Sequence, residues 1–147
     1  MRKQFQKLGH RVRIEFLEEW YKESYLSQDV VIVLRGLSEY KVYDGNYNIM
    51  WNISHPDKVS HFEYEKYDQI YVASEMAFDK LSSSLNTKVD ILLQATDPEV
   101  FYKKKNIEIS KRDKILFVGN SRNVYRKIVK DSISNELPIS VYGSRWE

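Results

Sequence analysis

The segment KILFVGNSRNVYRK, which begins at Lys114, joins a short apolar run to residue types that can bind an anion. Gly119 follows the apolar run, and a residue without a side chain lets a ligand approach the backbone closely. Asn120 or Ser121 can cap a helix that begins at about Ser121. The free amides and the positive dipole end of such a helix attract phosphate groups. The segment therefore predicts a phosphate site at a strand-to-helix turn.

Two arginines strengthen this prediction. Arg122 and Arg126 are four residues apart, so on the expected helix they share one face near its first turn. A guanidinium group binds phosphate oxygens in bidentate fashion. A solvated basic helix after an ordinary turn is the alternative, because a strand, a glycine and a cap often follow one another without a ligand.

A second place where chemistry is possible is the segment NIMWNISHPD, in which an apolar run ends at His55. Ligands of open α/β sheets bind at the carboxyl ends of the strands, and an imidazole there can act as a general base. The alternative is that His55 belongs to a capping loop and only satisfies local hydrogen bonds.

Three further polar residues follow predicted strands at the same edge of the sheet. Arg35 ends the run VVIVLR and can meet an anion or pair with a nearby carboxylate. Gln94 and Asp97 follow the run DILL, and they can point into the same crevice or form a polar turn that starts at Asp97.

Several other kinds of site are excluded by motif and spacing. The chain has no cysteine, no glycine-rich nucleotide loop and no G-x-S-x-G motif. His55 and His61 are six residues apart, which is not the spacing of a helical zinc pair. No Asp-x-Asp pair is present to hold a diphosphate through a metal. We therefore expect no metal and no cofactor, and arginines and amides would have to hold any diphosphate.

Composition places the chain among ordinary globular proteins. It has 147 residues, 42% of them hydrophobic and 30% charged, with a net charge of +2. So small a charge gives no general attraction to nucleic acid. The longest aliphatic run, Val30–Leu34, is too short to span a bilayer, and no secretory signal is evident. We expect a cytoplasmic protein without a transmembrane segment.

The elements that would position these residues follow from hydrophobic periodicity and turn residues. We expect a helix end at residues 1–8, capped by Gly9, before the first strand. Strands are expected at 11–16, 29–36, 47–54, 69–74, 88–94, 115–118 and 138–144, and helices at 56–68, 74–85 and 121–135. The strand expected at 29–36 contains a continuous, mostly β-branched apolar run, Val30–Leu34, as in a strand that is covered on both faces. Alternating strands and helices predict an α/β fold with a mainly parallel sheet.

The same periodicity divides the chain. Residues 101–112 lack a clear pattern and form the predicted linker between domains at 1–100 and 113–147. The first domain has no strand ahead of its opening helix, and the second is a bare β-α-β unit with little core. We therefore expect a fragment of a larger protein, cut at both ends.

Taken in order, five segments resemble the CgeB-like, spore-maturation-type glycosyltransferases, which have the GT-B fold. These are VVIVLRGL, the stretch from WNISHPDKVS to YDQIYVAS, LLQATDPEVF, KILFVGNSRNVYRKIV and ISVYG. The resemblance covers the chain from about Val12 onward. It implies two Rossmann-like domains, an acceptor-side domain at 1–100 that lacks its first strand and the truncated start of a donor-side domain at 113–147.

The resemblance also implies a function. Such enzymes transfer a sugar from a nucleotide-diphosphate donor, without a metal, to a glycan or a cell-surface or spore polymer. By this likeness His55 is the candidate base, and the remaining candidates divide into a donor diphosphate group (Gly119, Asn120, Ser121, Arg122 and Arg126) and an acceptor-side group (Arg35, Gln94 and Asp97). The fragment alone is expected to be inactive. A non-catalytic nucleotide- or anion-binding module and a remnant interaction domain remain as alternatives.

Overall fold

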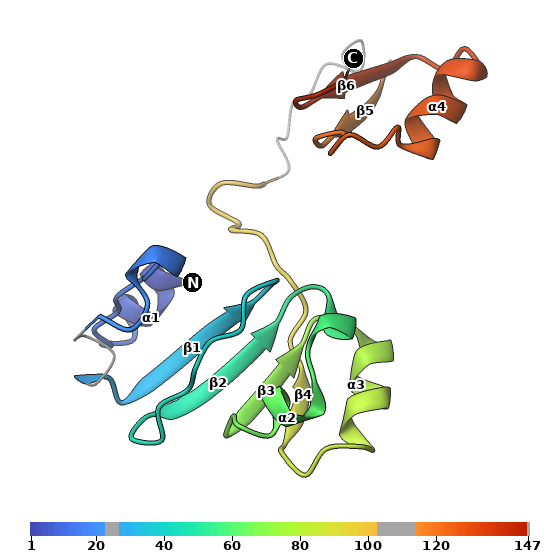
Figure 1. The fold of residues 1–147 in the computed structure, drawn as a ribbon. Helices are drawn as coiled ribbons and strands as arrows, with labels where there is room; N and C mark the ends of the chain where they lie inside the picture. Colours follow the sequence, from blue (N-terminus) through green and yellow to red (C-terminus); the bar gives the residue numbers. More distant parts are fainter. Residues whose placement is uncertain (23–26, 103–113, 147) are drawn as a thin grey trace. The chain divides into compact units, whose positions relative to one another are not determined.

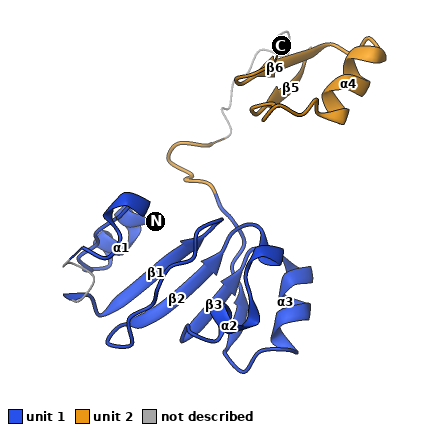
Figure 2. Ribbon diagram, viewed as in Figure 1, with its two compact units in different colours: residues 1–95 blue, residues 96–147 orange. Residues whose placement is uncertain are grey.

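The computed structural model describes residues 1–22, 27–102 and 114–146. The chain forms two compact units, residues 1–95 and 96–147 (Figures 1 and 2). Most of the predicted linker, residues 103–112, lies outside the described residues. No helix among the described segments has the length and apolar character needed to cross a bilayer.

The first unit is built on a four-stranded parallel sheet in the order β1-β2-β3-β4 (Figure 1). The strands are β1 (Val30–Arg35), β2 (Tyr47–Asn52), β3 (Gln69–Val72) and β4 (Val89–Ile91). Each was predicted from the sequence, although β4 ends three residues earlier than expected. The sheet with its flanking helices is an α/β architecture compatible with a Rossmann-like fold.

Helices connect the later strands. The pieces between β2 and β3 are η3 (Pro56–Lys58) and α2 (His61–Tyr64), and α3 (Glu75–Ser82) connects β3 to β4. The single helix predicted at 56–68 is therefore two short pieces, because Val59 is extended and Ser60 starts a new helix. Ser74 caps α3 as predicted, since its Oγ accepts a hydrogen bond from the amide of Ala77.

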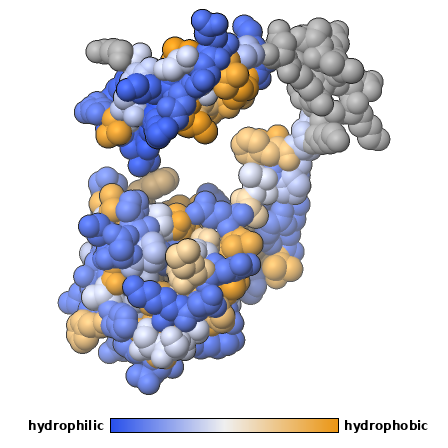
Figure 3. All heavy atoms as spheres, turned by 90° about the vertical axis from the view of Figure 1, so that its right-hand side faces the viewer, coloured by the Kyte–Doolittle hydropathy of each residue, from blue (hydrophilic) through white to orange (hydrophobic). Residues whose placement is uncertain are grey.

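One face of the sheet carries the core. Val33, Met50, Ile70 and Val89 lie side by side across the four strands, and all are buried. Tyr64 of α2 and Leu81 of α3 belong to the same cluster, so both helices cover this face. The outer surface on the side of α3 is mostly hydrophilic, with separate apolar residues (Figure 3).

The other face of β1 is open, contrary to the prediction of a strand covered on both sides. Val30, Ile32 and Leu34 alternate with the buried residues and are 49%, 37% and 51% exposed. A continuous apolar run thus does not require two covered faces.

The chain before β1 contains α1 (Arg2–Lys7) and η1 (Leu17–Glu19). Gly9 has a positive φ of 87° just after α1, as expected of a residue at a helix end. The strand predicted at 11–16 is wrong, because these residues are not in a strand and pair with none of the described strands. Instead Phe16 is 70% exposed, and its amide donates to the carboxylate of Glu19. Alternation of apolar and polar residues is not enough to form a strand. A neighbouring strand must also provide backbone hydrogen bonds.

The second unit is a β-α-β arrangement of β5 (Ile115–Val118), α4 (Lys127–Ser134) and β6 (Ile139–Tyr142). The two strands pair in parallel. Val129 is the one apolar residue in the described part of this unit that is fully buried. The prediction of little core is confirmed for these residues.

Candidate functional site

The carboxyl edge of the first sheet is the place where the sequence predicted acceptor-side chemistry. Arg35 and Asn52 end neighbouring strands in register, and Val72 is the next partner in the same row. Arg35 and Asn52 are each 3% exposed, so the polar side chains that end these two strands are buried and do not face solvent.

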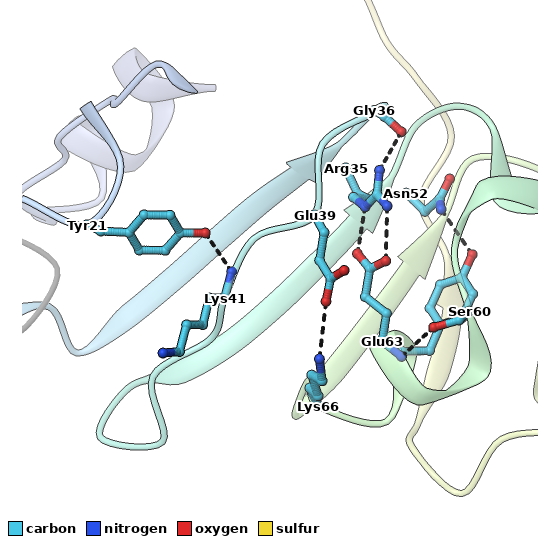
Figure 4. Close-up of polar contacts among 10 residues, drawn as sticks. Tyr21, Arg35, Gly36, Glu39, Lys41, Asn52, Ser60, Glu63 and Lys66 are labelled. Carbon is cyan, nitrogen blue, oxygen red and sulfur yellow. Dashed lines mark hydrogen bonds and ion pairs between the residues drawn. The ribbon is translucent and has the colours of Figure 1, made fainter. Parts of the chain in front are cut away.

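Arg35 is bound by a carboxylate that the sequence did not identify (Figure 4). Its Nε donates to Glu63 Oε1 at 2.6 Å and its Nη2 to Glu63 Oε2 at 2.9 Å. Its Nη1 donates to the carbonyl of Gly36 at 2.8 Å. The hydrogen bonds that Arg35 donates to the carboxylate of Glu63 raise the pKa of Arg35, whereas burial acts in the opposite direction. Of the two alternatives for Arg35, the structure shows pairing with a carboxylate, and no ligand anion is needed to balance it.

The short helix α2 positions Glu63. Ser60 caps this helix, because its Oγ accepts from the amide of Glu63 at 3.1 Å. Next to it, the hydroxyl of Tyr64 accepts from Asn52 Nδ2 at 3.0 Å. The pair Ser60 and Glu63 is the S-x-x-E signal of a helix start. It could have located the helix, but not the distant partner of the glutamate.

His55 lies just beyond β2 at the same edge. It has φ 52° and ψ 52°, a left-handed conformation that a residue before proline rarely adopts. Its Nδ1 lies 3.0 Å from the Oγ of Ser54, and the side chain is exposed. Strained backbone of this kind is found at functional sites and in tight turns. The structure therefore places His55 at the predicted edge and in a strained loop.

Gln94 ties the chain after β4 back to the end of β2. Its Nε2 donates to the carbonyl of Ile53 at 2.8 Å, and the indole of Trp51 donates to the carbonyl of Leu92 at 2.8 Å. Gln94 thus has a structural partner at the carboxyl edge. Asp97 belongs to the second unit, where its Oδ1 accepts from the amide of Glu99 in a local turn. Of the three acceptor-side candidates, Arg35 and Gln94 share this edge.

The donor-side loop between β5 and α4 differs from the prediction. α4 begins at Lys127 and not at Ser121, and its N-cap residue is Arg126, which makes no side-chain cap. The caps predicted at Asn120 and Ser121 are therefore wrong. The physical reason is that both residues are bound to the chain that follows β6. Asn120 Oδ1 accepts from the amide of Ser144, and Ser121 Oγ donates to the carbonyl of Arg145.

Gly119 also has a structural role in this loop. Its amide donates to the carbonyl of Tyr142 at 2.8 Å, and its carbonyl accepts from the indole of Trp146 at 2.7 Å. A side chain on Gly143 would lie 2.1 Å from the same carbonyl. The amide of Ser121, a buried residue, donates to the carbonyl of Ser144. The groups of residues 119–121 that were expected to bind a phosphate thus largely form hydrogen bonds within the second unit.

The two arginines are placed differently from the prediction. Arg122 lies outside the helix with φ 54°, so Arg122 and Arg126 do not form an i, i+4 pair on a helix face. Arg122 is exposed. The Nε of Arg126 is buried and has no hydrogen-bond partner among the described residues.

A hollow of about 550 Å³ lies along α4 close to Arg126 in sequence. It is lined by Tyr125, Lys127, Lys130, Ile133 and Ser134. Lys127 forms an ion pair with Asp131, and Lys130 is exposed. Clusters of three or more His, Cys, Asp or Glu side chains that could hold a metal are not found in the described segments.

Comparison of the chain with protein-family models, with curated proteins and with solved structures found no match.

Proposed function

We propose that this chain is part of a metal-independent glycosyltransferase of the CgeB-like, GT-B kind, whose second unit binds the diphosphate of a nucleotide-sugar donor. The observation that carries the proposal is the loop between β5 and α4. It follows the carboxyl end of a parallel strand, where ligands of α/β sheets bind, and it carries two arginines.

The groups proposed to bind the diphosphate lie at the start of α4 rather than at Ser121. Arg126 has a buried Nε without a hydrogen-bond partner among the described residues, and a buried donor of this kind gains most from an added acceptor. Lys127 and Lys130 line the hollow along α4, whose volume lies in the range of small-ligand sites. The amides of the first helical turn add a positive dipole end.

In the proposed reaction these cations stabilise the negative charge that develops on the departing diphosphate. A general base then removes the proton of the acceptor hydroxyl. His55 is the candidate for this role, because it is exposed at the carboxyl edge of the first sheet. The acceptor would be a glycan or a cell-surface or spore polymer. For the 147 residues themselves, we propose binding of the diphosphate without turnover.

A simple anion-binding module without transferase activity is the second candidate function. One observation favours it: Arg35 is neutralised by Glu63, so the first unit offers fewer groups for acceptor chemistry than its sequence suggests.

Titration of the ¹⁵N-labelled chain with UDP, inorganic pyrophosphate and uridine distinguishes the two candidates. A donor site recognises the nucleoside as well as the diphosphate, so UDP should bind more tightly than pyrophosphate and shift the amides of residues 119–130. Equal affinity for UDP and pyrophosphate at these amides would favour the anion module. Binding of neither compound there would refute both.

A further inference from the structure

The first unit carries a hollow of its own, apart from the residues proposed for acceptor chemistry. Its volume is about 460 Å³, within the range of small-ligand sites. Three segments contribute to it: the chain after η1, the connection from β1 to β2, and the turn between α2 and β3. The described residues that line it are Tyr21, Glu39, Lys41, Val42, Asp44 and Lys66.

The ring of Tyr21 forms an aromatic wall of this hollow. Its hydroxyl accepts from the amide of Lys41 at 2.7 Å (Figure 4), and its ring stacks on the ring of the buried Tyr40 with centroids 5.3 Å apart. The φ of Tyr21 is 63°, which is uncommon for a bulky residue. Even so, Tyr21 is 46% exposed. An exposed ring that is already held in place loses little conformational freedom when a ligand binds.

The charged residues of the hollow balance one another. Two lysines and two carboxylates line it. Lys66 is paired with Glu39 at 3.1 Å (Figure 4). The side chains of Lys41 and Asp44 are exposed and make no hydrogen bond or ion pair with any described residue. The hollow thus offers hydrogen-bond donors and acceptors together, without a net charge.

We propose that this hollow binds a sugar ring of a glycan. A sugar hydroxyl both donates and accepts hydrogen bonds, so it matches an ammonium and a carboxylate in one hollow, such as those of Lys41 and Asp44. The face of an aromatic ring carries negative potential, and the C–H groups of a pyranose pack against such a face. A hollow without net charge gives no general attraction to a phosphate or to a cation.

A free amino acid or a short peptide, with one charge of each sign, is the nearest alternative ligand. Its gain from Lys41 and Asp44 would be small, because exposed ion pairs contribute little in water. The exposed ring of Tyr21 has no counterpart in a simple zwitterion, whereas a pyranose offers its C–H face. The aromatic wall therefore favours the sugar.

As a site for the acceptor glycan, the hollow rests on the proposed function, in which a glycan receives the transferred sugar. His55, the candidate base, does not line the hollow. The ring that binds here would therefore be a unit of the glycan other than the one that reacts. Binding of this ring requires no donor, so it can be measured separately from the donor site.

Titration of the full ¹⁵N-labelled chain with the methyl glycosides of glucose, galactose, mannose and N-acetylglucosamine tests the proposal. At least one glycoside should shift the amides of residues 21, 39–44 and 66 in a saturable way. The dissociation constant should be on the order of 1 mM, because a single sugar ring has few atoms to contribute binding energy.

Two variants of the lining residues should weaken this binding. Tyr21→Ala removes the aromatic wall and should weaken it by about tenfold or more, and Asp44→Ala removes one acceptor and should weaken it by about fivefold. Tyr47→Ala and Asp57→Ala are the matched controls, since these side chains are 48% and 71% exposed and do not line the hollow. Asp44 is exposed, so Asp44→Ala decides the test even where Tyr21→Ala fails to fold.

Three results would overturn the proposal. They are no saturable shift with any of the four glycosides, equal affinities for Asp44→Ala and the unmodified chain, and shifts at these amides with the dipeptide alanyl-alanine but with no glycoside. The donor site is tested by UDP at residues 119–130. A chain that binds a glycoside here but not UDP keeps this site and loses the donor site, and the reverse result overturns this site alone.

Discussion

The guanidinium of Arg35 and the carboxylate of Glu63 form a buried bidentate ion pair between the end of β1 and helix α2 (Figure 4). Each residue is 3% exposed. The pair connects two segments that are 28 residues apart and closes the carboxyl edge of the sheet. An arginine that the sequence offers as a ligand-binding cation is thus a structural group whose charge is balanced within the unit.

Removing one partner of this pair should destabilise the first unit strongly. Glu63→Leu leaves the charge of Arg35 buried and uncompensated, and we expect a loss of about 3–5 kcal/mol in the free energy of unfolding. The double variant Arg35→Met with Glu63→Leu removes both charges and should be distinctly more stable than Glu63→Leu alone. Urea unfolding monitored by circular dichroism measures both changes.

The pair of Lys66 and Glu39 provides the control for this experiment. It spans 3.1 Å, but its side chains are 32% and 53% exposed. Glu39→Gln should therefore change the stability by no more than about 1 kcal/mol. Equal losses for Glu39→Gln and Glu63→Leu would show that the Arg35 pair is not buried in solution.

Two neighbouring buried tyrosines should respond in opposite ways to loss of their hydroxyls. Tyr64 is hydrogen-bonded to Asn52, so Tyr64→Phe should cost about 1 kcal/mol. The buried hydroxyl of Tyr67 has no partner among the described residues, so Tyr67→Phe should leave the stability unchanged or raise it by about 1 kcal/mol. Chemical unfolding at pH 7 compares the variants. A large loss for Tyr67→Phe would reveal a partner for this hydroxyl.

The same tyrosines predict a loss of stability at high pH. Burial, with a contribution from Glu63, raises the pKa of Tyr64 to about 12 in the folded state. Between about pH 10, the ordinary value for tyrosine, and pH 12 the unfolded chain releases a proton that the folded chain retains. The stabilisation is therefore complete below pH 10 and is lost as the pH rises toward 12. Burial also raises the pKa of Tyr67, which acts in the same direction.

Unfolding experiments from pH 9 to 12 test whether the stability falls as the pH rises. The slope of stability against pH should be shallower for Tyr64→Phe than for the unmodified chain. Tyr47→Phe is the matched control, because Tyr47 is 48% exposed. A slope that is the same for Tyr64→Phe and the unmodified chain would contradict the claim that the raised pKa of Tyr64 causes this loss of stability.

In the second unit, Gly143 permits the close approach of two loops. It has a φ of 148°, and an added Cβ would lie 2.1 Å from the carbonyl oxygen of Gly119. Gly143→Ala should therefore unfold the second unit while the first unit keeps its structure, as seen in the amide spectrum. Gly36→Ala is the control, since its nearest neighbour would be 4.0 Å away. Unchanged signals from β5 and β6 in Gly143→Ala would contradict the geometry of this loop.

The sequence predicts well those features that depend on residues close together in the chain. The apolar run Val30–Leu34 lies in β1, and Ser74 caps α3 as its position suggests. Prediction from the sequence fails where the hydrogen-bond partner of a residue lies far along the chain. Ser121 has the local features of a helix cap, but its hydroxyl binds the carbonyl of Arg145, 24 residues later.

The candidate site shows the same limit. A glycine followed by polar residues is common to phosphate loops and to structural turns, so local pattern alone does not distinguish them. From the sequence, Arg35 could bind an anionic ligand or pair with a carboxylate of the chain. The position of Glu63 after folding decides for the carboxylate. The buried Nε of Arg126 could not be foreseen, because burial of a side-chain atom depends on packing that the local sequence does not show.

The most direct test of the proposed donor site is the affinity of the chain for UDP, measured by calorimetry with and without Arg126. We expect UDP to bind the unmodified chain, and Arg126→Gln to weaken this binding by about tenfold or more, because a charged hydrogen-bond donor to phosphate is lost. Arg13→Gln removes the same charge from the first unit and should leave the affinity unchanged. Equal affinities for all three proteins, or no binding of UDP by any of them, would contradict the account.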